Sequence, residues 1–172
     1  MIQWLKNLFS KLFSAPKKPP VGIPKNPEVI DPPWLILAKA EQAKGVREVA
    51  GSKHNERILE YHRATSLKAT TDEVPWCASF MSWLFLQVGL ESRRSARAKD
   101  WLSWGVPLTK PIHGCVVIYT RMGGGHIDLY LSGYKTGRIK GLGGNESNMV
   151  TDNSQDESTV VGYRWPRDYP LP

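Results

Sequence analysis

The chain has 172 residues, a length that suits one domain with appendages. Hydrophobic residues make up 41% of it and seven residues are Trp, a composition that excludes a disordered chain and predicts a packed core. The net charge of +7 favours a polyanionic partner such as an anionic membrane surface or a cell wall. We expect no nucleic acid as partner, because no basic run interleaves with aromatic residues.

Residues 1–15 predict an amphipathic helix with a broad apolar face. This face repeats at spacings of three and four, and it comprises Ile2, Leu5, Phe9 and Leu12, widened by Trp4, Leu8 and Phe13. The segment lacks the continuous apolar stretch and cleavage site of a secretory signal. It suits either a membrane interface or docking on protein, meaning the chain's own body or a partner such as a virion protein. Residues 16–33 are rich in proline and predict a semi-rigid linker.

Residues 34–172 predict an α+β domain, because helical patterns come first and strand patterns follow. We expect helices over residues 34–49, after a cap at Asn55, over residues 75–90 and over residues 93–105. From Pro111 the segments become short, β-branched and aromatic, and glycines separate them. They predict antiparallel strands over residues 115–120, 125–134, 138–145 and 160–166. The expected fold is a small antiparallel sheet with helices packed on it.

Cys77 stands two residues after Pro75, at the predicted start of the most hydrophobic helix. Backbone N–H groups at a helix N-terminus carry partial positive charge, which favours a thiolate and therefore a nucleophile. The alternative is a small buried side chain. Cys115 is read as structural, and one disulfide between the two cysteines stays open. Neither cysteine has a second thiol or a His at ligand spacing, so no zinc or other metal site is expected.

His126 follows three glycines and begins an apolar strand, a setting that leaves room for a substrate backbone beside a base. The alternative is a histidine with a purely structural role. A third polar group should orient the imidazole from a neighbouring strand. Asn145 lies about one strand and turn later and is the first candidate, while Glu146 competes with it because a carboxylate can do the same work.

The strings EVPWCASFMSW, GHI and GLGGNESN, followed by YRWP, together resemble the papain-like NlpC and CHAP superfamily of phage and bacterial cell-wall hydrolases. The similarity is to a compact group marked by PWCA-x-F and a later GGN, and it covers the chain from about Trp34 to Pro166. It implies a papain-like α+β core without a cofactor, with Cys77 as nucleophile, His126 as base and Asn145 as third member. It also implies hydrolysis of an amide in peptidoglycan. A phage-encoded enzyme of this kind would act at the host's periplasm and cell wall.

Asp128 departs from the pattern of that group, and two further residues, Trp76 and Tyr61, could belong to the expected site. Asp128 stands where the group usually has glycine, and it shares a strand face with His126, so it could lie near the base or bind a substrate amine. Trp76 adjoins the nucleophile and could line the substrate groove or belong to the core. The backbone N–H of Cys77 is one expected oxyanion donor, and Tyr61 is a speculative second.

Other classes of protein remain as rivals. The chain could be an inactive papain-like module that only binds cell wall, although intact Cys77 and His126 argue against this. It could be a structural virion protein anchored by residues 1–15, which is compatible with enzymatic activity. A toxin delivered to rival bacteria is the third alternative.

Overall fold

The computed structural model describes residues 29–172, and the expectations for the amphipathic segment and most of the linker lie outside the described residues. The helices are α2 (Pro33–Ala43), α3 (Glu56–Arg63) and α4 (Cys77–Gln87), with 3₁₀ turns η1 (Ala98–Ser103) and η2 (Glu157–Thr159). The strands are β1 (Val106–Leu108), β2 (Val116–Arg121), β3 (Gly124–Tyr134), β4 (Arg138–Glu146), β5 (Met149–Asp156) and β6 (Val160–Trp165). No helix within this part of the chain is both long and apolar enough to cross a bilayer.

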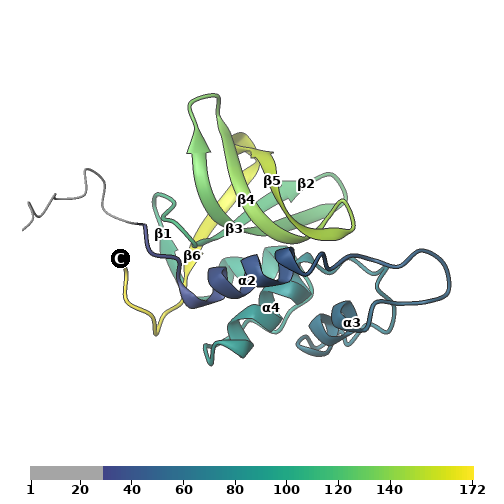
Figure 1. Cartoon of the computed structure of the whole chain (residues 1–172). Helices are drawn as coiled ribbons and strands as arrows, with labels where there is room; N and C mark the ends of the chain where they lie inside the picture. The colour runs from purple at the N-terminus through teal and green to yellow at the C-terminus, as the bar shows by residue number, and fades with distance from the viewer. Residues whose placement is uncertain (1–28) are drawn as a thin grey trace, which may run out of the picture.

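The six strands form one antiparallel sheet in the order β1-β6-β2-β3-β4-β5. Helices α2, α3 and α4 gather on one side of it, and α4 packs against β3 and β4 (Figure 1). The protein therefore has the mixed α+β architecture that the order of helical and strand patterns predicted.

Several boundaries differ from the sequence expectations for identifiable reasons. Helix α2 begins at Pro33, and Asp31 already bonds to Lys39 and His113, so the last residues of the predicted linker belong to the body. The same helix ends six residues early, before Gly45 with a φ of 67°. Two strands were not predicted from the sequence. The reason is that β1 is a short edge strand with a central proline, and that β5 is largely polar.

Helix α4 is the centre of the core, because every residue from Cys77 to Phe85 is buried. A helix buried on all sides shows almost no amphipathic pattern, as its sequence indicated. Its first turn lies directly on β4 at Gly144. A Cβ atom at that glycine would lie 2.5 Å from Cζ3 of Trp76 and 2.8 Å from Cβ of Phe80. The absence of a side chain here lets the N-terminus of α4 approach the sheet, and this approach positions Cys77.

The change Gly144→Ala should therefore lower the free energy of unfolding by about 1–3 kcal/mol, the usual cost of overpacking a core. Urea unfolding followed by circular dichroism measures this change. Gly124→Ala is the matched control, because a Cβ atom at Gly124 meets nothing within 4 Å. Equal stability of the two variants would show that α4 does not depend on this close approach.

Candidate active site

Cys77 is the first residue of α4 and Trp76 is its N-cap. The first hydrogen bond of this helix runs from the backbone N–H of Phe80 to the Trp76 carbonyl, at 2.8 Å. Cys77 is 7% exposed, so its thiol lies close beneath the surface. The Cys77 side chain lies close enough to the imidazole of His126 to help raise its pKa, and the structure thus brings together the two residues predicted as nucleophile and base.

His126 is the third residue of β3 and lies opposite Tyr119 of β2 in the antiparallel register. The two rings stack with their centroids 6.1 Å apart, which fixes the plane of the imidazole. His126 is 2% exposed. Its backbone and ring are therefore both held by the sheet, as the sequence position at the start of an apolar strand predicted.

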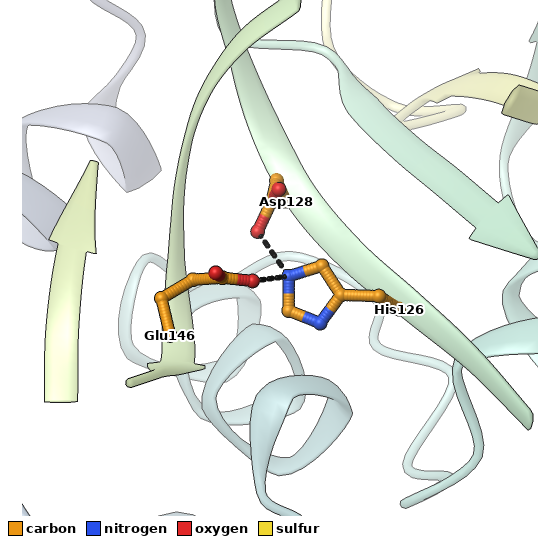
Figure 2. A group of neighbouring side chains, drawn as sticks. All are labelled: His126, Asp128 and Glu146. Carbon is orange, nitrogen blue, oxygen red and sulfur yellow. Dashed lines mark hydrogen bonds and ion pairs between the residues drawn. The ribbon is translucent and has the colours of Figure 1, made fainter. Parts of the chain in front are cut away.

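Two carboxylates meet the Nε2 atom of His126 (Figure 2). Asp128 contributes Oδ1 at 2.7 Å, and Glu146 contributes Oε1 from the end of β4. The other ring nitrogen points away from both carboxylates and is the one left for Cys77 (Figure 2). The imidazole therefore bridges a thiol and a pair of acids.

Burial disfavours a charged imidazole. The charge of Asp128 outweighs this effect, together with the interactions of the ring with the side chains of Asp128, Cys77 and Glu146. Together they raise the pKa of His126 well above its ordinary value. Burial likewise works to raise the pKa of Glu146, yet its bonds to His126 and to Arg121, whose Nη2 lies 2.9 Å away, hold that pKa below the usual range. The two carboxylates thus favour the imidazolium form of the ring, and Arg121 balances the second carboxylate.

Asp128 is fully buried, and its remaining oxygen accepts a hydrogen bond from Nδ2 of Asn153 at 3.0 Å. Glycines make room for it on the adjacent strand, because a Cβ atom at Gly141 or Gly143 would collide with its carboxylate. This placement corrects the expectation that Asp128 contacts substrate. It is instead the carboxylate near the base, the other role that its place on the strand allowed.

Among the described residues, Glu146 and not Asn145 bonds to the imidazole. In the orientation that satisfies its neighbours, the Asn145 amide faces Trp76 and Glu48. The strand pattern could not decide between Asn145 and Glu146, because the β4–β5 register shifts between Gly143 and Glu146 and breaks the alternation of faces. The only indication for Glu146 in the sequence was that a carboxylate can orient an imidazole.

Two further expectations need correction. Trp76 is fully buried, with its indole Nε1 donating to Glu48 at 2.8 Å, so it belongs to the core and does not line a groove. Tyr61 is also fully buried, and its hydroxyl donates to Glu41, so it is no oxyanion donor. Cys115 is buried as well, and both cysteines are free thiols, which rules out the disulfide that the sequence left open.

The three residues around Nε2 also have the chemistry of metal ligands. The nearest ligand atoms of His126, Asp128 and Glu146 all lie within 4.8 Å of one another. A divalent cation there would take the place of the ring proton that the carboxylates now bind. These are the residues of the described chain that could hold such an ion.

Comparisons with known proteins assign the chain to no family. No family model matches the sequence, and no curated protein matches it significantly. The chemistry of the site is therefore argued from its geometry.

Replacing Asp128 by Asn tests the charge on the ring. The change removes one negative charge but keeps an oxygen for Nε2, so the pKa of His126 should fall by about 1–3 units, the usual effect of a neighbouring carboxylate. NMR titration of the His126 ring protons measures it. Asp152→Asn, at an exposed carboxylate of β5, is the control and should leave the His126 titration unchanged. An unchanged pKa in Asp128→Asn would show that this carboxylate does not stabilise the imidazolium.

Proposed function

We propose that the protein is a cysteine hydrolase that cleaves an amide bond in peptidoglycan, built on a papain-like core. The observation that carries the proposal is the sequence of neighbouring groups from the Cys77 thiol through the His126 imidazole to two carboxylates, of which Asp128 is fully buried and Glu146 partly buried. A nucleophile bonded to a base, with the base oriented by a third group, is the arrangement that covalent catalysis needs.

The chemistry follows from the protonation state of this contact. Transfer of the thiol proton to His126 gives a thiolate beside an imidazolium, and the Cys77 sulfur then attacks the carbonyl carbon of the amide. His126 returns its proton to the departing nitrogen as the C–N bond breaks, which leaves a thioester on Cys77 and a free amine. His126 next removes a proton from water, and the hydroxide formed attacks the thioester. This step releases a carboxylic acid and restores the thiol.

The N-terminus of α4 supplies the second element of such a reaction. The tetrahedral intermediate carries an oxyanion close to the Cys77 backbone, and the N–H of Cys77 is the donor we assign to it. The partial positive charge of the helix N-terminus favours the same oxyanion. The described residues thus contain a nucleophile, a base, groups that orient the base and an oxyanion donor.

Peptidoglycan as substrate rests on two supports. The PWCA-x-F, GH and GGN strings resemble phage and bacterial cell-wall hydrolases, and Cys77 and His126 lie at the matching positions. The net charge of +7 suits an anionic bacterial surface. We propose that the enzyme acts at the wall from the host periplasm, and that residues 1–15 add contact with a membrane surface or a virion protein.

An inactive wall-binding module is the principal alternative, and the site argues against it. Placing one buried and one partly buried carboxylate beside a buried histidine costs free energy unless the charges are compensated. A module that only binds gains nothing from an imidazole held this way beside a thiol at a helix N-terminus. We therefore favour the enzyme.

Substitution of the two cysteines separates the nucleophile from a structural thiol. Cys77→Ala should lower the rate of peptidoglycan cleavage at least roughly 1,000-fold, as loss of a catalytic nucleophile does. Cys115→Ala should keep most of the activity, because burial raises the pKa of the Cys115 thiol to about 12 and keeps it protonated. Mass spectrometry of the digested wall measures the products and identifies the amide by its new termini. Full cleavage by a folded Cys77→Ala protein would refute the proposal.

A further inference from the structure

The end of β4 contains a bulge that directs two consecutive side chains to different parts of the site. The β4–β5 register shifts between Gly143 and Glu146, and Asn145 has a φ of 60°, in the left-handed region. Glu146 reaches the Nε2 atom of His126. Asn145, one residue earlier, reaches the N-terminus of α4. One short segment therefore contacts both the base and the helix that bears the nucleophile.

Asn145 and Glu48 together hold Trp76 at its backbone and at its ring. In the amide orientation that satisfies both neighbours, the Asn145 oxygen accepts the backbone N–H of Trp76 at 3.1 Å, and its nitrogen donates to Oε1 of Glu48 at 3.2 Å. The same Glu48 oxygen accepts the indole N–H of Trp76 at 2.8 Å. The three residues form a closed set of hydrogen bonds, which we call the Trp76 clamp.

The clamp is anchored to the turn that follows the bulge. The backbone N–H of Glu48 donates to the Asn148 carbonyl at 2.8 Å, and Arg47 forms an isolated bridge with Met149. Glu48 is thus tied to the β4–β5 turn and cannot move independently of Asn145. The bulge, the turn and the clamp form one connected unit.

Trp76 is the residue through which this unit reaches Cys77. Its peptide immediately precedes the nucleophile, and its carbonyl accepts the first hydrogen bond of α4. Rotation of the Trp76 peptide would therefore shift both the thiol and the N–H that we assign to the oxyanion. A shift of about 1 Å at a reacting group can cost 100-fold in rate.

We infer that Asn145 and Glu48 are positioning residues that keep Cys77 in register with His126. Asn145 fixes the nucleophile's helix while Glu146, from the same bulge, fixes the base. The inference rests on the proposed role of Cys77 as nucleophile. It gives Asn145 a function other than orienting the imidazole, and it gives a function to Glu48, which the sequence did not single out.

The test compares two substitutions that the backbone tolerates equally. Asn145→Gly removes the clamp side chain at a position whose positive φ suits glycine. Ser147→Gly is the matched control, because Ser147 is exposed, lies in the turn two residues after Asn145 and has a φ of 50°. Thermal unfolding establishes that both variants are folded. The readouts are the rate constant for alkylation of Cys77 by iodoacetamide at neutral pH, and kcat and KM on purified peptidoglycan.

Asn145→Gly should lower both the alkylation rate and kcat by about 10- to 100-fold with little change in KM, whereas Ser147→Gly should match the parent protein. Glu48→Ala should show the same loss, and Glu48→Gln should restore much of it, because glutamine keeps an oxygen for both donors. The double variant Asn145→Gly with Glu48→Ala should be little worse than either single change, since the two act through one residue.

A folded Asn145→Gly protein with the alkylation rate and kcat of the parent would overturn the inference, as would losses in Asn145→Gly and Glu48→Ala that simply add. Alkylation needs no substrate, so it tests the clamp independently of wall cleavage. Undiminished cleavage by Cys77→Ala would refute the proposed function, whereas an undisturbed thiol in Asn145→Gly would refute only the clamp.

Discussion

The sharing of one imidazole nitrogen by two carboxylates, one buried and one partly buried, is the interaction on which the rest of the site depends. Asp128 and Glu146 both meet Nε2 of His126, which leaves the other ring nitrogen for Cys77. Two carboxylates this close together, one of them fully buried, repel each other and need nearby positive charge to stay ionised. Arg121 supplies one positive charge and the ring supplies another once it accepts the thiol proton, so the two acids favour transfer of that proton to His126.

The fold meets this requirement with glycines and an irregular strand. Gly141 and Gly143 leave space for Asp128, and Gly144 lets the first turn of α4 approach β4. The bulge that follows turns Asn145 toward α4 and Glu146 toward the imidazole. The GLGGNE segment therefore contacts both the helix that bears Cys77 and the base His126, and it positions the two relative to each other.

The sequence predicted the α+β class, α4 and four of the six strands, because these elements have clear periodicity and glycine boundaries. It also predicted Cys77 as nucleophile and His126 as base, because a cysteine at a helix start and a histidine at a strand start suit these roles. It missed the contacts of Glu48 with Trp76 and Asn145, left Trp76 between groove and core, and preferred Asn145 to Glu146 as the residue that orients the imidazole. These depend on a bulge and on contacts between segments distant in sequence, which no local pattern encodes. Asp128 was recognised as a neighbour of His126, but only the structure shows that it is buried.

The central claim is that Cys77 forms a thioester with the wall peptide, and hydroxylamine tests it most directly. Digestion of purified peptidoglycan with added hydroxylamine should divert the acyl group from water, so mass spectrometry should find hydroxamates at the new carboxyl ends. The Cys77→Ala protein should give neither hydroxamate nor acid. Cleavage that yields only carboxylic acids at saturating hydroxylamine would mean that water attacks the amide directly, and would contradict the account.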